Sequence, residues 1–448
     1  MSTPLYDSLK NFADSAPLRL HMPGHKGRMD GLFQDVARMD FTELPPVGDL
    51  YADTGAVAVA ETLFAEAAGA RDALFFSCGS TQGIYTMLSA AVGMGGTLIL
   101  DRGCHKSVYH GMALLDIAPV YLHPDILDCG LSEPVSPKLL EQALQAHPEA
   151  KAVLVTSPSY YGILTDLAPL AEVCHSHGTY LLVDQAHGAH FPFVGIPSAA
   201  QAGADLCVVS AHKTLPALGS SSLLYVGNQA PWEKFRLKEL SAIFSTTSPS
   251  WPILASIDRA REQLERSDGY LKTAEQVRLL RERINEETAF LALTDSPALA
   301  LDPCRLAVDT GSAGLSGFEA DRLLRARNIY LEMADDRYLV AIFTCNDQRD
   351  DYVRFLSALK DLPVGAPCSM PNQALPVPII RQSLREALFG PVEQLALLAA
   401  AGRTAAQVVA PYPPGIPVLA PGEEITEKHI AYLQKKSYNI EEKISVAL

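Results

Sequence analysis

Lys213 directly follows an apolar, strand-like run and lies in the segment SAHKT at residues 210–214. A lysine amine in this position can hold a carbonyl cofactor as a Schiff base. Asp184 closes a second apolar run, and the triplet Gly-Ser-Thr at 79–81 follows a third. A carboxylate can stabilise a protonated ring nitrogen, and a helix start can bind phosphate. These features together predict a pyridoxal-phosphate (PLP) site.

The position of Asp184 supports a role in that site. PLP acts as an electron sink, so its ring nitrogen must stay protonated, and a strand-end carboxylate supplies the stabilising charge. A lone aspartate at a strand end more simply caps the next turn. Asp184, however, lies 29 residues before Lys213 with one strand-like run between them. This spacing favours the cofactor role for Asp184.

The phosphate group needs backbone N–H groups and hydroxyls at a helix start, where the helix dipole favours an anion. Gly79, Ser80 and Thr81 have these properties, and Ser210 and His212 can add contacts from the side of the lysine. Since such triplets start helices routinely, this prediction depends on the other elements of the site.

Histidines add further candidates. His105 follows an apolar run and could stack on the cofactor ring, although an isolated histidine is often only a loop or cap residue. His187 could reach the phenolic oxygen of the cofactor or the substrate carboxylate. Two closely spaced pairs, His175 with His177 and His187 with His190, suggest a metal site. Neither pair has an obvious third ligand, so we expect no metal.

Composition limits the class of protein. The chain has 448 residues, of which 48% are hydrophobic and 19% charged, as in a compact protein of about two to three domains. A net charge of −15 argues against nucleic acid as a partner. Eight cysteines without a Cys-x-x-Cys pair argue against a disulfide framework. Without a leader or a long apolar segment, we expect a cytoplasmic protein that does not bind membranes.

Residues 57–226 alternate between strand-like and helix-like runs, the pattern of an α/β domain with a mainly parallel sheet. Strands are expected at 73–77, 97–100, 118–122, 151–155, 179–183, 205–209 and 221–226. Helices are expected at 81–92, 106–116, 137–146 and 169–177. Ligands of such sheets bind at the carboxyl ends of the strands, where Lys213 and Asp184 are expected.

The pattern changes after this region. Helices are expected at 231–240 and 253–287, and a smaller α+β domain follows with strands at 303–309 and 338–344 around a helix at 317–327. The proline-rich segment 411–417 predicts an ordered turn or extended segment. We therefore expect three parts: an N-terminal arm at 1–56, a PLP-binding large domain at 57–289 and a small domain at 290–448.

Several longer motifs occur in a characteristic order. They are HMPGHKG at 21–27, TEL at 42–44 before GDL at 48–50, HKS at 105–107, SAHKTLPAL at 210–218, TSPSWPILAS at 247–256, the segment 411–417 and PGE at 421–423. In these motifs the sequence resembles the Orn/Lys/Arg decarboxylases of PLP fold type I, which have an aspartate aminotransferase-like large domain. The resemblance is to their short bacterial form, without the N-terminal wing domain.

The resemblance implies a role for each matching residue. Lys213 is the Schiff-base lysine, Asp184 contacts the ring nitrogen, His105 stacks on the ring, and His187 ends the strand-end motif. The phosphate is surrounded by Ser80, Thr81, Ser210 and His212. One departure is Gln185, because the motif usually reads Asp-Glu-Ala-His. The decameric assembly of the long members should not be carried over.

The implied activity is decarboxylation of arginine, lysine or ornithine to the corresponding amine and carbon dioxide. Glu43, Asp49 and Asp53 are candidates for binding the distal cation of the substrate, or are ordinary surface carboxylates. A homodimer with active sites at the subunit interface is expected. Alternatives are an aminotransferase or an aldolase-type lyase on the same fold, because the pocket chooses which bond breaks, or a non-catalytic PLP-binding regulatory protein.

Overall fold

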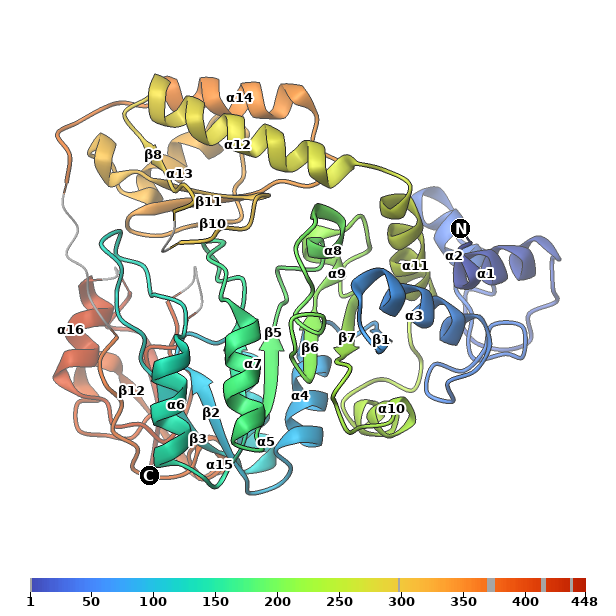
Figure 1. Ribbon diagram of the computed structural model, residues 1–448, viewed down its shortest axis with the longest axis horizontal. Coiled ribbons are helices and arrows are strands. Elements are labelled where there is room, and N and C mark those ends of the chain that lie inside the picture. Colours follow the sequence, from blue (N-terminus) through green and yellow to red (C-terminus); the bar gives the residue numbers. More distant parts are fainter. Residues whose placement is uncertain (1, 297–298, 369–374, 412–415, 436–437) are drawn as a thin grey trace. The chain divides into compact units, whose positions relative to one another are not determined.

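The chain folds into two compact units, each assembled from segments that are distant in the sequence (Figure 1). The computed structural model describes residues 2–296, 299–368, 375–411, 416–435 and 438–448. Unit 1 comprises Met1–Ala90, Tyr180–Lys272 and Thr344–Asn346, and unit 2 comprises the remaining residues. The boundaries expected at residues 56 and 289 stay a prediction.

Unit 1 holds four strands in the order β1-β7-β6-β5. They span β1 Asp72–Phe76, β7 Ser222–Val226, β6 Leu206–Val209 and β5 Tyr180–Asp184. Strands β5 and β6 are parallel, whereas β7 is antiparallel to both β6 and β1. The carboxyl ends of β1, β5 and β6 therefore lie at one edge, where β7 begins.

Helices cover these strands. They span α1 Pro4–Asp14, α2 Gln34–Met39, α3 Gly55–Ala68, α4 Ser80–Ala91, α8 Phe191–Val194, α9 Ala211–Thr214, α10 Lys234–Ile243 and α11 Trp251–Glu265, with a 3-10 turn at Gly31–Phe33. Helix α3 packs on β1, and α1 packs on α3 and α11 (Figure 1). Phe64 of α3 contacts the rings of Phe75 and Tyr225, so burial of aromatic area joins helix and strands.

Unit 2 contains the parallel strands β4-β2-β3 and an antiparallel sheet β10-β11-β9-β8. The first set spans β2 Thr97–Asp101, β3 Ala118–Leu122 and β4 Ala150–Thr156, with α5 Lys106–Leu115, α6 Pro137–Ala146 and α7 Leu167–Ser176. The second spans β8 Leu291–Ala292, β9 Arg305–Asp309, β10 Met333–Ala334 and β11 Tyr338–Ile342, with a 3-10 turn at Gly311–Ala313, α13 Gly317–Arg325 and α14 Arg349–Lys360.

The C-terminal part of unit 2 adds a strand pair, β12-β13, and two helices. These elements span α15 Leu384–Phe389, β12 Val392–Ala396, a 3-10 turn at Leu397–Ala399, α16 Glu427–Lys435 and β13 Lys443–Ala447. Buried residues such as Leu397, Leu433 and Ile444 form its own apolar cluster. No helix among the described residues has the length and apolar character needed to cross a bilayer.

The strands expected from the sequence are confirmed with shifts of one or two residues. One expectation was wrong, because the single helix at 253–287 is two helices, α11 and α12 (Gly269–Glu287). The break lies where Ser267 Oγ accepts a hydrogen bond from Gly269 N at 3.3 Å, a local bond that competes with continued helix. Of the segment 411–417, residues 412–415 lie outside the described part of the chain.

The helix that starts at Ser80 lies very close to strand β6. A Cβ atom added at Gly83 would be 2.4 Å from Val208 Cγ2. We therefore expect Gly83→Ala to lower the free energy of unfolding by about 1–3 kcal/mol through overpacking, although alanine is the better helix former. Urea denaturation of this variant, of Val208→Ala and of the double variant provides the test. The double variant should lose less unfolding free energy than the two single variants lose together, because Val208→Ala makes room for the new methyl group. Losses that simply add would contradict the close approach of Gly83 to Val208.

Candidate active site

The predicted site residues of unit 1 converge because of strand register. Asp184, the last residue of β5, pairs with Val208 of β6, and Val209 pairs with Leu223 of β7. On the other side of β7, Phe76 of β1 pairs with Ser222. The residues that follow β1, β5 and β6 therefore leave the strands at one edge, as expected for a ligand site in an α/β fold.

Lys213 lies at this edge in the short helix α9. Its Nζ atom is 3.1 Å from Nε2 of His187, which is itself buried. Asp184 is also buried, and its Oδ1 accepts a hydrogen bond from Ala186 N at 3.1 Å. This bond fixes the turn that leads from Asp184 to His187. The structure thus brings the amine of Lys213 into contact with the imidazole of His187, three residues after the buried carboxylate of Asp184.

The turn at Gly79 is connected to the lysine segment through neighbouring carbonyl groups. Gly79 N donates to the carbonyl of Ser220 at 2.8 Å, and His212 Nδ1 lies 2.8 Å from the carbonyl oxygen of Ser221. Gly79 has a φ of +76°, a backbone conformation that glycine adopts without strain. A Cβ placed there would meet no heavy atom within 4 Å among the described residues, so the turn borders open space.

Two buried hydroxyls at this edge suit a phosphate ligand. Ser210 Oγ and Ser221 Oγ have no hydrogen-bond partner among the described residues, although both side chains are fully buried. Buried polar groups are normally paired, and an oxyanion would accept hydrogen bonds from such hydroxyls. The residues present therefore fit the phosphate of PLP. The sequence prediction included Ser210 but not Ser221, although a run of three serines at 220–222, where strand β7 begins, was visible in the sequence.

Gln185, the departure from the usual motif, points away from this edge. Its Oε1 accepts hydrogen bonds from Ala199 N at 3.1 Å and from Cys207 Sγ at 3.5 Å, and its side chain is 1% exposed. Burial raises the pKa of the Cys207 thiol, and the Asp184 carboxylate raises it further, so the thiol stays protonated and can donate. Gln185 therefore stabilises the interior behind Asp184 through these two hydrogen bonds.

Two of the three candidate substrate carboxylates have structural partners. Asp53 pairs with Lys238 at 3.0 Å and with Lys234 at 3.1 Å, and both lysines also pair with the buried Glu61. Asp49 Oδ1 accepts hydrogen bonds from the backbone N–H groups of Tyr51 and Ala52. These contacts favour the alternative reading of Asp53 and Asp49 as structural carboxylates. Glu43 Oε2 accepts a hydrogen bond from the hydroxyl of its neighbour Thr42 at 2.8 Å.

His105 belongs to unit 2, where it begins helix α5. Its Nδ1 accepts a hydrogen bond from Ser107 N at 3.2 Å, which is an N-cap. The turn before it is anchored by buried Arg102, which donates to Glu423 Oε2 at 2.9 Å. The C-terminal PGE motif thus supports the turn that carries His105. Ring stacking by His105 stays a prediction.

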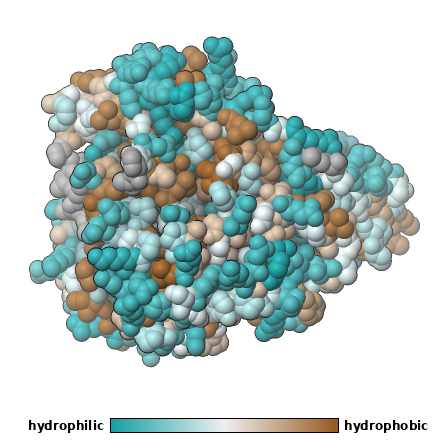
Figure 2. Space-filling model, in the orientation of Figure 1, coloured by the Kyte–Doolittle hydropathy of each residue, from teal (hydrophilic) through white to brown (hydrophobic). Residues whose placement is uncertain are grey.

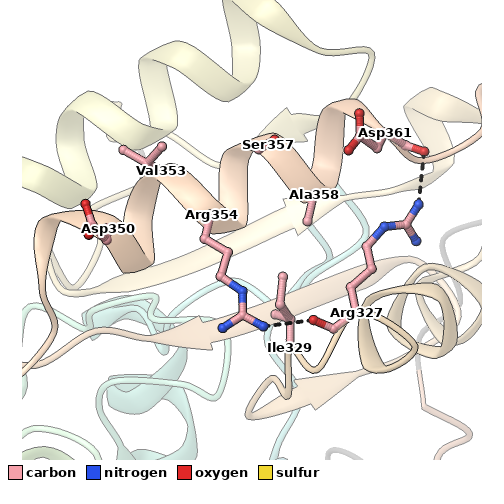
Figure 3. A pocket seen from close by; sticks show the side chains of 8 residues that line it. All are labelled: Arg327, Ile329, Asp350, Val353, Arg354, Ser357, Ala358 and Asp361. Atoms are coloured by element: carbon pink, nitrogen blue, oxygen red, sulfur yellow. Dashed lines mark hydrogen bonds between the residues drawn. The ribbon is translucent and has the colours of Figure 1, made fainter.

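A hollow in the surface of unit 2 has no comparable constellation (Figure 3). It is lined by Arg327, Ile329, Asp350, Val353, Arg354, Ser357, Ala358 and Asp361. The guanidinium of Arg354 donates to the carbonyl of Arg327 at 2.9 Å, and that of Arg327 donates to the carbonyl of Asp361 at 3.4 Å (Figure 3). Arg327 therefore caps the end of α14, and Arg354 holds the chain just after α13, so both arginines have a structural role.

Comparisons with known proteins show the family of this chain. The family described as "Orn/Lys/Arg decarboxylase, major domain" matches residues 3–291, and its C-terminal domain matches residues 370–442. The chain belongs to the Orn/Lys/Arg decarboxylase family. This membership identifies a PLP-dependent amino-acid decarboxylase and confirms PLP as its cofactor.

Individual relatives cover nearly the whole chain. An arginine decarboxylase of Bacillus subtilis (strain 168) is 35% identical, covering 97% of this chain and 93% of the relative. An arginine decarboxylase of Halalkalibacterium halodurans is 34% identical with the same coverage. The crystal structure of the Francisella novicida lysine decarboxylase LdcF has a TM-score of 0.84 at 20% identity, covering 100% of this chain and 81% of that chain.

The structural comparison also confirms the fold. Sphingomonas wittichii serine palmitoyltransferase matches with a TM-score of 0.52 and 18% identity, and the match covers 68% of this chain and 75% of that chain. Together with the decarboxylases, it supports the expected fold type I architecture, with a large, mainly parallel sheet and a smaller C-terminal domain. Strand β7 is an antiparallel exception that the sequence did not predict.

The buried hydroxyl of Ser210 allows cofactor binding to be separated from folding. We expect Ser210→Ala to weaken PLP binding about 10-fold or more, because a hydrogen bond to an anion is lost. The apoprotein should keep its stability or gain about 1 kcal/mol, because an unpaired buried hydroxyl is removed. Cofactor titration and urea denaturation of the apoprotein measure the two effects.

Ser89→Ala provides the matched control for that experiment. Ser89 Oγ is likewise buried without a hydrogen-bond partner in the described chain, but it lies near the far end of α4. Its removal should leave the affinity for PLP unchanged. Equal affinity in wild type and Ser210→Ala would contradict the assignment of Ser210 to the phosphate.

Proposed function

We propose that this enzyme decarboxylates a basic amino acid and that its substrate is arginine. Support for arginine comes from relatives named arginine decarboxylase, which are 32–35% identical and cover 94–97% of the chain. The observation that carries the chemistry is the contact of Lys213 Nζ with His187 Nε2 beside Asp184.

The proposed roles follow from chemistry at this edge of unit 1. Bound PLP supplies a conjugated ring that accepts the electron pair released from the bond between Cα and the carboxylate. Lys213 provides the amine that holds the cofactor between turnovers. Asp184 holds the proton on the ring nitrogen, and His187 exchanges a proton with Lys213 Nζ across 3.1 Å. Ser80, Thr81, Ser210 and His212 hold the phosphate, and His105 stacks on the ring.

The distal cation of the substrate requires an acidic partner. Of the three carboxylates expected for this role, Asp53 is paired with two lysines and Asp49 stabilises a turn. Glu43, which is partly exposed, keeps its carboxylate available beyond the bond from Thr42. We therefore assign the counter-charge for the substrate cation to Glu43 and retain Asp49 and Asp53 as structural residues.

Product analysis of the holoenzyme tests the reaction. Purified protein is incubated separately with arginine, lysine and ornithine, and we expect carbon dioxide and agmatine from arginine at the highest kcat/KM. Lys213→Ala should reduce turnover at least 1,000-fold, which corresponds to about 4 kcal/mol of transition-state stabilisation.

Other products would identify the competing functions. A keto acid would indicate an aminotransferase, and an aldehyde would indicate an aldolase-type lyase. If the protein binds PLP but forms no product from any of the amino acids, it would be a regulatory protein. Preference for lysine or ornithine would overturn the arginine assignment alone, whereas near-normal carbon dioxide release by Lys213→Ala would overturn the role of Lys213.

We further propose that the enzyme acts as a homodimer, with a second copy covering the N-terminal arm. This arm exposes several large apolar side chains, Leu18, Leu20, Met22, Met29, Leu32, Phe33 and Val36, of which Leu32 is 96% exposed. Figure 2 shows hydrophobic residues among hydrophilic ones at the surface of the lobe that carries α1 and α2. Exposed apolar side chains gathered on one segment favour an interface.

Analytical ultracentrifugation tests the dimer. We expect the wild type to sediment as two chains, and Leu20→Glu combined with Leu32→Glu to shift the equilibrium toward the monomer, because charges would be buried at the interface. Met94→Glu is the control, because Met94 is 69% exposed but lies outside the N-terminal arm. A fully active wild-type monomer would refute the proposal.

A further inference from the structure

Tyr51 contacts the loop beside the proposed phosphate turn. Its hydroxyl donates to Ser245 Oγ and lies 3.3 Å from the carbonyl oxygen of Thr246. Ser245 Oγ is in turn 3.8 Å from Sγ of Cys78, the residue directly before Gly79. A chain of contacts thus runs from Tyr51 to the residue that precedes the phosphate turn.

The backbone around Tyr51 is held from both sides. Asp49 Oδ1 accepts from Tyr51 N at 2.9 Å, and Lys238 Nζ donates to the carbonyl of Leu50 at 2.9 Å. Asp53 pairs with the same lysine at 3.0 Å. Lys238 is 2% exposed and Asp53 is 32% exposed, so the ammonium end of the ion pair is the part that is shielded from water. These contacts make the segment a fixed support from which the phenol projects.

The end of helix α10, which leads into the loop contacted by Tyr51, packs against helix α4. Gln82 Nε2 donates to the carbonyl of Ser241 at 3.2 Å, and the rings of Tyr85 and Phe244 meet edge to face with centroids 5.4 Å apart. Burial raises the pKa of the Tyr51 hydroxyl, so it stays protonated and can donate at neutral pH. The loop at 245–246 is therefore contacted by Tyr51 and follows directly on a helix end that is fixed against α4.

We propose that Tyr51 is a positioning residue for the phosphate turn at residues 79–81, acting through Ser245 and Cys78. The inference rests on the proposed role of that turn in binding the cofactor phosphate. Tyr51 fixes the loop at 245–246, and the loop limits the movement of Cys78 and of the start of α4. The phosphate donors are thereby held in place before the cofactor arrives, which is preorganisation.

Tyr51→Phe in the full-length enzyme tests this role, because only the hydroxyl is removed. We expect the Kd for PLP to rise about 3- to 10-fold, as for loss of one hydrogen bond, while kcat at saturating PLP changes less than about 2-fold. The phosphorus NMR signal of bound PLP should shift or broaden. Ser245→Ala should have the same effect, and the double variant should be no worse than either single variant.

Tyr6→Phe is the matched control. Tyr6 lies in α1, where its ring packs against Arg259 at 5.1 Å, a contact that phenylalanine can keep. The affinity of the Tyr6→Phe variant for PLP and the phosphorus signal of its bound PLP should equal those of the wild type. A purely structural role of Tyr51 would lower the melting temperature of the apoprotein without changing PLP affinity or the phosphorus signal, and that result would overturn the proposal. Failure of the proposed function can be distinguished from failure of the role of Tyr51, because in the first case the wild type itself would show no turnover.

Discussion

The parallel pairing of β5 and β6 is the constraint on which the site depends. Hydrogen bonding in register places Asp184 beside Val208, so the chain leaves both strands at the same edge. The turn after β5 then carries His187 and helix α9 after β6 carries Lys213, with 3.1 Å between their nitrogens. A shift of one residue in this register would turn the side chains to the opposite face of the strands. The relative positions of His187 and Lys213 are therefore set by the backbone pairing of two buried strands.

The neighbouring strand β7 extends this edge in a different way. Because β7 is antiparallel, its beginning lies where β1 and β6 end, and its preceding serines meet both flanking turns. Ser220 binds the glycine turn and Ser221 binds His212 through adjacent carbonyl groups. Their backbone groups join the turns, while the hydroxyl of Ser221 stays available for a ligand. The antiparallel strand β7 thus links the turn at Gly79 to the segment that carries Lys213.

The sequence predicted the parts that burial and local spacing determine. Apolar runs such as 180–183 had to be buried strands, and polar residues at their ends had to lie at the ligand edge. Other features depend on contacts between distant residues. The direction of β7 and the pairing of Asp53 with Lys234 and Lys238 leave no local pattern in the sequence. Tyr51 and Ser245 were missed for the same reason, because 194 positions separate the two hydroxyls.

Gln185 shows how a departure from a motif is to be judged. A residue directly after a cofactor-binding aspartate suggests an effect on the reaction, yet strand alternation directs it to the opposite side. Its oxygen accepts bonds from Ala199 N and the Cys207 thiol, and these groups need only an acceptor. A neutral amide provides this acceptor without placing a charge in the interior, where desolvation opposes ionisation. The amide of Gln185 therefore stabilises the interior behind Asp184 and does not face the strand ends near Lys213.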